Sequence, residues 1–257
     1  MIDSSAIVHS SARIDEGVVV GPYSVIGENV EVKKGCWIGP HVVIKGPAII
    51  GENNRIFQFC SIGDDPQDKK FKGEEESILK IGNGNTIREY CSINRGTKEG
   101  GGVTSIGDEN WIMAYIHIAH DCIIGNRNTF ANNATLAGHV TIEDFVTLGG
   151  FTGVHQFCRI GRYSFTAISS IVVKDIPPYL MVSGNVAKPA GLNREGLKRH
   201  NFTSDTIKLI RKAYKIVYRE GLLLNVALQK LEPLANESEE VAGFARFISE
   251  SRRGIVR

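Results

Sequence analysis

Residues 112–157 determine the fold of this chain, and they read IMAYIHIAHDCIIGNRNTFANNATLAGHVTIEDFVTLGGFTGVHQF. An apolar residue returns at every sixth position of this stretch, beginning with Ile112. The same spacing extends over residues 2–62, 81–93 and 106–172, where 24 of 26 six-residue units begin with Ile, Leu or Val. A period of six matches neither a helix, which has 3.6 residues per turn, nor a single strand, which has a period of two. It therefore indicates a structure built from internal repeats.

We interpret each six-residue unit as a short strand followed by a turn, so that three units close one triangular coil of 18 residues. The first residue of a unit points into the prism, and the third and fourth residues lie at or near its outside. Successive coils stack through backbone hydrogen bonds at a strand spacing of about 4.8 Å, and each coil contacts only its neighbours. Glycine is frequent at the second position, where we expect a corner that needs unusual backbone angles.

The cysteines and the charge balance indicate the class of protein. All five cysteines occupy the fifth position of a unit, which favours small apolar packing residues over catalytic ones. Their odd number and the lack of a CxxC pair favour a reducing, cytoplasmic location. A net charge of +2 gives no indication of nucleic-acid binding. We expect no signal peptide and no integral membrane segment, because the first residues are charged and no apolar run approaches the length of a membrane span.

The pattern predicts two parts in the chain. Residues 1–185 are expected to form a β-helix with excursions at 64–80 and 97–105, and residues 186–257 are expected to form a C-terminal helical domain. Each excursion is either a solvated loop or a carrier of binding residues, because long loops on rigid scaffolds often have that role.

Helix signals and positive charge mark the C-terminal part. Thr203 or Ser204 can cap one helix and Ser238 another, while Pro233 is expected to end the helix between them. Residues 190–220 contain eight Lys and Arg residues against three acids. This basic segment is either a solvated face or a surface for an acidic partner or a diphosphate.

The coil length converts sequence spacing into spatial proximity. His120, Gly138 and Gln156 are 18 residues apart and third in their units, so they should form one column. Asp121 and His139 should form the column beside it for the same reason. We interpret this concentration of polar groups as a functional site rather than as scattered surface residues.

Two chemistries fit these residues. In the first, His120 is a general base that Asp121 orients, and the N–H of Gly138 stabilises the oxyanion of an acyl-transfer intermediate. In the second, His117, His120 and His139 bind zinc across a trimer interface, as in the γ-class carbonic anhydrases, which have the same β-helix. A third possibility is a non-catalytic solenoid that binds a partner through its basic segment.

Several segments resemble one family of enzymes. Residues 117–122 (HIAHDC), 131–140 (ANNATLAGHV), 154–158 (VHQFC), 95–97 (RGT) and 193–199 (NREGLKR) resemble the acyl-[acyl-carrier-protein]:UDP-N-acetylglucosamine O-acyltransferases of lipid A biosynthesis. These are hexapeptide-repeat acyltransferases, and the resemblance covers essentially the whole chain. It implies a mainly β fold, namely a left-handed parallel β-helix of hexapeptide repeats with a C-terminal α-helical domain.

The resemblance also implies an activity and its residues. It implies transfer of a 3-hydroxyacyl chain from acyl carrier protein to the 3-hydroxyl of UDP-N-acetylglucosamine, in a homotrimer with sites between subunits and without a metal or other cofactor. His120 would be the base, Asp121 its partner and Gly138 the oxyanion donor. The other implied substrate contacts are Gln67, Asp68 and Lys70, reaching from the adjacent subunit, His117, His139 and Gln156 in the site, and Asn193, Glu195, Arg199 and His200 at the nucleotide end.

The chain departs from the family pattern at two positions, and one further position bears on selectivity. His200 stands where a second Arg is usual, which makes that phosphate contact dependent on pH, and Asn94 stands where His is common. We expect Ile168, together with Phe165, to limit the acyl groove and to favour a chain nearer ten than fourteen carbons. The acceptor atom remains open between the 3-hydroxyl and a 3-amino analogue.

Overall fold

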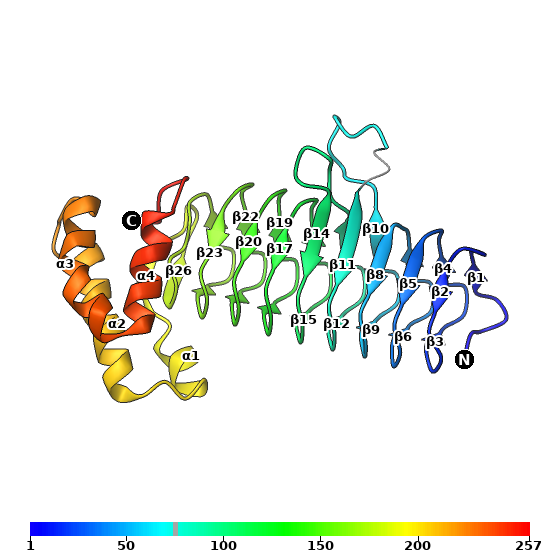
Figure 1. Ribbon diagram of the computed structural model, residues 1–257, viewed down its shortest axis with the longest axis horizontal. Helices are drawn as coiled ribbons and strands as arrows, with labels where there is room; N and C mark the ends of the chain where they lie inside the picture. Colours follow the sequence, from blue (N-terminus) through cyan, green and yellow to red (C-terminus); the bar gives the residue numbers. More distant parts are fainter. Residues whose placement is uncertain (74–76) are drawn as a thin grey trace.

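The computed structural model describes residues 1–73 and 77–257, so residues 74–76 of the first excursion lie outside the described residues. The strands stack as a three-sided prism whose coils succeed one another along the long axis of the molecule (Figure 1). In the coils of the β-helix, strands pair in parallel with strands three places later in the chain, so that each side of the prism is one sheet. The chain is a left-handed parallel β-helix followed by α-helices, which confirms the predicted fold class.

Three sheets form the sides of the prism within the described residues. The first sheet contains β1 (Ile7–Val8), β4 (Val25–Ile26), β7 (Val43–Ile44), β10 (Ser61–Asp64), β13 (Ser92–Asn94), β16 (His117–Ile118), β19 (Thr135–Leu136), β22 (Gly153–Val154) and β25 (Ile171–Val172). The second sheet contains β2 (Arg13–Ile14), β5 (Val30–Val32), β8 (Ala48–Ile50), β11 (Ile78–Ile81), β14 (Val103–Ile106), β17 (Ile123–Ile124), β20 (Thr141–Ile142) and β23 (Arg159–Ile160). The third sheet contains β3 (Val19–Val20), β6 (Trp37–Ile38), β9 (Arg55–Ile56), β12 (Thr86–Ile87), β15 (Trp111–Ile112), β18 (Thr129–Phe130), β21 (Thr147–Leu148), β24 (Phe165–Thr166), β26 (Leu180–Ser183) and β27 (Lys188–Leu192).

The strand register follows the 18-residue coil. Ile118 pairs with Leu136, and Leu136 pairs with Val154 in the next coil. These first-position side chains point into the prism, where Ile118 and Leu136 are 0% exposed. Each such side chain contributes about 1.5–3 kcal/mol through its burial. The core is therefore a column of aliphatic side chains along the axis, and it holds residues 18 apart as vertical neighbours.

The cysteines belong to this core. All five are buried and free, and burial raises the pKa of the Cys122 thiol to about 12 and that of Cys158 to about 11. These two thiols therefore remain protonated near neutral pH and are poor nucleophiles. Their environment supports the interpretation of the cysteines as packing residues.

Glycine is required at the second position of a unit for a different reason from the one expected. A Cβ on Gly21 would lie 2.8 Å from the backbone of Gly39 in the next coil, and Gly21 does not have a positive φ. The expectation of unusual backbone angles at this position is wrong, because close stacking of the coils excludes a side chain there. Left-handed angles occur at the fourth position instead, with φ 60° at Asp121 and 62° at His139.

Buried asparagines join successive coils at the corner between the second and third sheets. The side-chain oxygen of Asn54 accepts the backbone N–H of Asn85 at 2.9 Å, and Asn85 accepts that of Asn110 at 2.9 Å. Asn110 in turn accepts the N–H of Asn128 at 2.9 Å. This asparagine ladder satisfies backbone groups that the strands leave unpaired at the corner.

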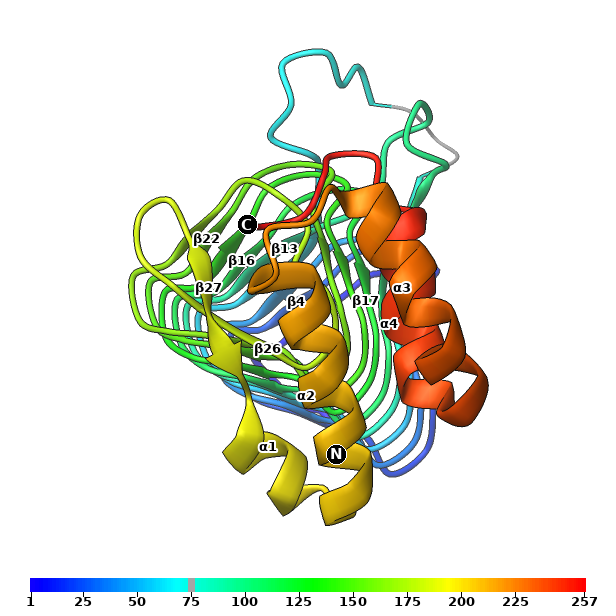
Figure 2. The same cartoon turned by 90° about the vertical axis from the view of Figure 1, so that its left-hand side faces the viewer.

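Both excursions leave the prism at the corner between the first and second sheets. The first connects β10 to β11 and the second connects β13 to β14. Figure 2 shows the two loops lying together over this corner, opposite the side that carries α1. The two segments that interrupt the repeat thus cover the same edge of the molecule.

The C-terminal residues form helices against the last coils (Figure 2). The side chains of Thr203 and Ser238 accept backbone N–H groups at the helix starts, which confirms both predicted caps. The expectation that a helix ends at Pro233 is wrong, because the helix continues for four residues beyond it. The helices are α1 (Arg194–Arg199), α2 (Ser204–Tyr218), α3 (Leu224–Glu237) and α4 (Glu239–Ser249).

β-structure continues to Leu192, so the proposed division between residues 185 and 186 stays a prediction. Among the described residues, no helix combines the length and the apolar character that crossing a bilayer requires.

Candidate active site

His120 lies at the covered corner, in the turn between β16 and β17, directly against Gly138 of the next coil. Their two coils are joined here by a hydrogen bond from the backbone N–H of His139 to the carbonyl of His120, 3.0 Å long. A Cβ on Gly138 would lie 2.6 Å from Cε1 and 2.8 Å from Nε2 of the His120 imidazole. Only glycine therefore leaves room for the ring, and the column predicted from the 18-residue spacing is present.

Asp121 holds the other side of this imidazole. Its Oδ2 atom lies 2.7 Å from Nδ1 of His120, and its side chain is only 1% exposed. Burial raises the pKa of Asp121, but hydrogen bonds from His120 and Thr97 outweigh burial and bring the pKa below its usual value. A charged carboxylate at this position keeps the proton on Nδ1 of His120, so Nε2 is the nitrogen that can accept a proton.

His139 completes a ring cluster above the pair. Its imidazole meets that of His120 edge-on with centroids 5.1 Å apart, and it stacks on Phe157 at 4.4 Å. Its Nε2 atom lies 3.7 Å from Oδ2 of Asp121. Burial is the main cause that lowers the pKa of His139, although Asp121 acts against it. His139 is therefore a neutral ring near pH 7 that can donate or accept a hydrogen bond.

His117 lies on β16, the strand that leads directly into the turn of His120, and a serine fixes its ring. Its Nδ1 atom is 2.8 Å from the hydroxyl of Ser92 in the preceding coil. Burial, with the neighbouring His120 adding to it, lowers the pKa of His117. This second neutral imidazole lies three residues before His120, and its contact with a substrate stays a prediction.

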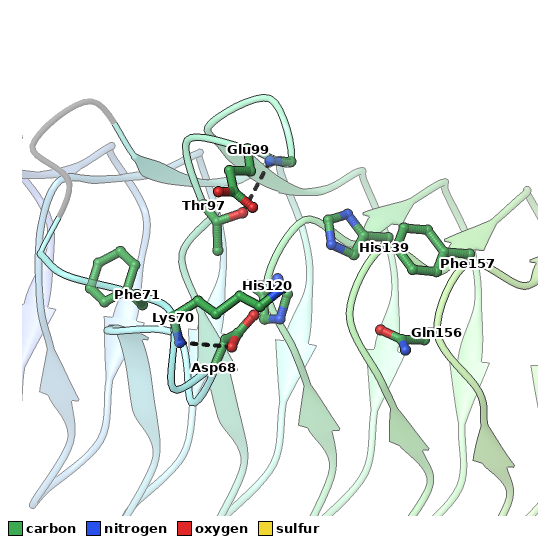
Figure 3. A pocket seen from close by; sticks show the side chains of 10 residues that line it. Asp68, Lys70, Phe71, Thr97, Glu99, His120, His139, Gln156 and Phe157 are labelled. Atoms are coloured by element: carbon green, nitrogen blue, oxygen red, sulfur yellow. Dashed lines mark hydrogen bonds between the residues drawn. The ribbon is translucent and has the colours of Figure 1, made fainter.

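A pocket of about 570 Å³ opens beside these rings (Figure 3). Asp68 and Lys70 line it from the first excursion, and the backbone N–H of Lys70 donates to Asp68. The sequence interpretation assigned these two residues to the site of an adjacent subunit, whereas the structure places them in the pocket of their own chain. Gln67 is exposed and does not line it. The lining residues are Asp68, Lys70, Phe71, Thr97, Glu99, Gly100, His120, His139, Gln156 and Phe157.

The residues expected at the nucleotide end lie elsewhere in the chain. Asn193, Glu195, Arg199 and His200 lie in or next to α1, on the side of the prism away from the excursions (Figure 2). The side chain of Asn193 caps α1 and donates to the carbonyl of Tyr163 at 2.9 Å. A single chain therefore does not bring these four residues to the pocket of His120.

The residues expected to set acyl-chain length lie on the third sheet and at the corner that follows it. Ile168 is 70% exposed at the corner between the third and first sheets. Its Cγ1 atom lies 4.0 Å from the position that a Cβ on Gly150 would take, so it stacks over Gly150 as the spacing predicted. Phe165 lies on β24 of the third sheet and not on the sheet that carries His117.

Comparison with known proteins shows what the chain is related to. A family model described as UDP N-acetylglucosamine O-acyltransferase, domain 2, matches residues 175–256, and one described as bacterial transferase hexapeptide (six repeats) matches residues 103–138. The acyl-[acyl-carrier-protein]–UDP-N-acetylglucosamine O-acyltransferase of Thiobacillus denitrificans is 52% identical over 256 residues, which cover 100% of this chain and 99% of that protein. The protein of the same name from Neisseria gonorrhoeae is 52% identical over 257 residues, with the same coverage.

This chain belongs to the UDP-N-acetylglucosamine O-acyltransferase family.

Solved structures of the O-acyltransferase family have the same fold. The UDP-N-acetylglucosamine acyltransferase of Francisella novicida matches with a TM-score of 0.98 and 46% identity, covering 100% of this chain and 94% of that one. The UDP-N-acetylglucosamine O-acyltransferase of Moraxella catarrhalis matches with a TM-score of 0.97 and 44% identity, covering 100% and 99%. The match includes both excursions and the C-terminal helices, which confirms the resemblance inferred from the sequence segments.

The zinc alternative requires His117, His120 and His139, and the described residues of this O-acyltransferase family member bring a different group together. Within the described residues, the group whose ligand atoms lie within 4.8 Å of one another consists of His120, Asp121 and His139. His117 is held by Ser92 instead. The carboxylate of Asp121 already accepts three hydrogen bonds, from His120 and from the amide and hydroxyl of Thr97.

Sequence analysis missed several residues that shape the pocket of this O-acyltransferase family member. Thr97 was noted only as part of the segment at residues 95–97, and it lies 24 residues from Asp121, which is not a multiple of the coil length. Phe71 and Glu99 also come from the excursions, where the repeat gives no spatial rule. Phe157 could have been found, because it lies 18 residues beyond His139 in the same column.

Proposed function

We propose that this chain transfers a 3-hydroxyacyl group from acyl carrier protein to the 3-hydroxyl of UDP-N-acetylglucosamine, the first step of lipid A biosynthesis. The full-length relatives bear the name of that activity. The observation that carries the proposal is the imidazole of His120, which lies between the buried carboxylate of Asp121 and the peptide backbone of Gly138 at the edge of a pocket. This arrangement supplies a base and an oxyanion donor, as acyl transfer requires.

The proposed reaction uses each group once. Nε2 of His120 accepts the proton of the sugar 3-hydroxyl while that oxygen attacks the carbonyl carbon of the thioester. The carbonyl oxygen takes the negative charge, and the N–H of Gly138 donates to it, which is worth roughly 3 kcal/mol. The carbon–sulfur bond then breaks, and the thiolate of the carrier receives the proton from His120. Asp121 stabilises the imidazolium that exists between the two proton transfers.

The sugar nucleotide is assigned to the open side of this pocket. His117, His139 and Gln156 are proposed to contact it from the coils, together with Asp68 and Lys70 from the first excursion. The positive charge of Lys70 and the neutral rings of the histidines suit a ligand that carries hydroxyls and a diphosphate. No cofactor or metal takes part in the proposed reaction, because the proton and the acyl group move between substrate and side chain.

We propose that the active form is a homotrimer. Exposed aromatic rings stack along the corner between the third and first sheets, at centroid distances from 4.9 Å (Tyr90–Tyr115) to 5.3 Å (His41–Phe59). The exposed fraction reaches 63% at Tyr23 and is 54% at Tyr115. A continuous apolar strip of this kind is typical of an association surface. The ring ladder consists of Tyr23, His41, Phe59, Tyr90 and Tyr115.

Such a trimer explains the position of α1. Three prisms that meet along this corner turn the third sheet of each subunit toward the first sheet of the next one. Because α1 follows β27 of the third sheet, Asn193, Glu195, Arg199 and His200 of one subunit then face the pocket of its neighbour. We propose that they hold the nucleotide end there. A carrier-protein donor and five free thiols fit a cytoplasmic enzyme.

Mass spectrometry of the product formed from UDP-N-acetylglucosamine and a defined 3-hydroxyacyl carrier protein tests the activity. The 3-O-acylated nucleotide is expected, and the 3-amino analogue of the acceptor, tested in parallel, decides which acceptor atom is preferred. His120→Ala should lower kcat by about 10²–10⁴, the range for loss of a general base. The matched control is His9→Ala, because His9 is an exposed histidine in the first coil. A loss below tenfold in His120→Ala would contradict the role of His120.

A further inference from the structure

The second excursion folds back over the carboxylate of Asp121. The backbone N–H of Thr97 donates to Oδ1 of Asp121 at 2.8 Å, and the hydroxyl of Thr97 donates to Oδ2 at 2.6 Å. The imidazole of His120 donates to the same Oδ2 at 2.7 Å. Two of the three donors on this carboxylate thus come from a residue of the loop and not from the coil that carries the site.

The direction of the Thr97 hydroxyl is fixed by the loop itself. The backbone N–H of Gly100 donates to the hydroxyl oxygen of Thr97 at 3.1 Å, so the single hydroxyl proton is free to point at Asp121. The N–H of Gly102 donates to the carbonyl of Thr97 at 2.7 Å and closes the turn. Hydrogen bonds within the loop therefore fix the position of Thr97.

Gly100 seals the carboxylate from solvent. A Cβ on Gly100 would overlap the carboxyl group of Asp121, so the backbone of the loop lies directly on it. The backbone N–H of Asp121 donates to the hydroxyl of Thr104, at 2.8 Å, where the chain returns to the prism. The result is a carboxylate that is 1% exposed although its position in the repeat is one of the outer ones.

We propose that Thr97 is a positioning residue of the site: its amide and hydroxyl orient the carboxylate of Asp121 toward Nδ1 of His120, and the backbone at Gly100 keeps water away from it. The proposal rests on the proposed function of the His120–Asp121 pair. A buried carboxylate stays charged only when donors replace its lost water, and Thr97 supplies two of them. Without the hydroxyl, Oδ2 has only His120 as a donor and loses its fixed direction.

Replacement of the hydroxyl tests this role. In Thr97→Val, kcat should fall by about 10- to 100-fold with KM nearly unchanged, the size expected for one hydrogen bond to a charged group. Thr97→Ser keeps the hydroxyl and should stay within about threefold of the wild type. The matched control is Thr152→Val, which removes the hydroxyl of another buried threonine, one that pairs with Thr166 away from the pocket. It should lower the melting temperature and leave kcat unchanged.

A double-mutant cycle shows whether Thr97 acts through Asp121. Thr97→Val should cost no further activity in an Asp121→Ala background, because interacting residues are not additive. Independently of activity, ¹³C NMR of labelled aspartate should show a higher carboxyl pKa for Asp121 in Thr97→Val and the wild-type value in Thr97→Ser. Additive losses, or equal losses in the valine and serine variants, would overturn the proposal. A wild-type protein without transferase activity would refute the proposed function instead, and the NMR comparison would still decide the role of Thr97.

Discussion

At the scale of single residues, the site separates charged from neutral groups within one buried cluster. Asp121 keeps its charge because its donors outweigh burial, whereas burial lowers the pKa of His117 and His139 and keeps both rings neutral. One anion beside His120 and two uncharged rings around it limit the repulsion that a protonated His120 meets during the reaction. The coil stacking produces this arrangement, since His117 and His120 come from one coil and His139 comes from the next.

The neutral state of His117 predicts a pH dependence of stability. Its pKa is lower in the folded protein than the ordinary value of 6.5, so the unfolded chain takes up a proton first as the pH falls. The free energy of unfolding should therefore decline below about pH 6.5 and be independent of this residue above it. Urea unfolding of the wild type and of His117→Gln, from pH 8 to 5 at one protein concentration, measures the difference. Identical slopes for the two proteins would contradict the assignment.

Ile168 predicts a selectivity for acyl-chain length. We propose that its exposed side chain, which lies over Gly150, shortens the groove that the acyl chain occupies, so the wild type should prefer a chain near ten carbons. Ile168→Gly should shift the preference toward fourteen carbons, because each additional buried CH₂ is worth about 0.8 kcal/mol. Relative kcat/KM values for carrier-linked 3-hydroxyacyl chains of ten, twelve and fourteen carbons provide the measurement. An unchanged order of preference would refute the role of Ile168.

At the scale of structural elements, the corners of the prism differ in how they satisfy the backbone. The asparagine ladder fills one corner with side-chain amides, whereas the corner of the site is covered by loops. In the ladder, Asn110 accepts from Asn128 and donates through Nδ2 to the oxygen of Asn85 and to the carbonyl of Gly125. One side chain thus serves three coils.

Loss of Asn110 should therefore destabilise the β-helix. Asn110→Ala leaves buried polar groups of the adjacent coils without partners, at about 1–3 kcal/mol for each group. We expect the free energy of unfolding to fall by about 2–4 kcal/mol, measured by denaturant titration. Asn132→Ala is the matched control, because this asparagine is exposed, and it should change stability by less than about 0.5 kcal/mol. Equal effects of the two substitutions would show that the ladder contributes little.

The same contrast explains what the sequence could predict. Where the period of six holds, spacing determines position, so the columns of His120 with Gly138 and of Asp121 with His139 were predictable. The burial of Asp121 was not, since it depends on a loop that follows no period. The role of Gly21 was also misread, because a repeat shows that a small residue is required without showing whether backbone angle or close approach is the reason.

At the scale of the whole molecule, the site and the residues around α1 can cooperate only between subunits. The pocket lies at one corner of the prism and α1 on another side (Figure 2). The proposed trimer therefore makes each site depend on two chains, with His120 from one and Arg199 from the next. An isolated subunit would keep the base His120 but would lack the residues around α1 of a neighbour that are proposed to bind the nucleotide.

Mixing of inactive subunits tests this dependence. His120→Ala and Arg199→Ala proteins, unfolded together and refolded as a mixture, should regain activity that neither shows alone. With equal amounts and random assembly, about a quarter of the sites would combine an intact His120 with an intact Arg199 from the neighbour. Arg194→Ala mixed with His120→Ala is a control for general effects of refolding. No recovery in the mixture, with trimers confirmed by light scattering, would place Arg199 and His120 in the same subunit's site.

The two ends of the prism differ, and this limits how the protein can aggregate. The first coil, with Ile2 48% and Ile7 66% exposed, presents backbone edges that another chain can extend, whereas the last coils are covered by α2 and α4. A filament grows only if a molecule has an unpaired strand edge at both ends, because each added molecule must expose a new edge for the next. With a single open end in the described part of the chain, contact through this edge joins two molecules head to head and then stops. The helical cap therefore keeps a long cross-strand stack from polymerising.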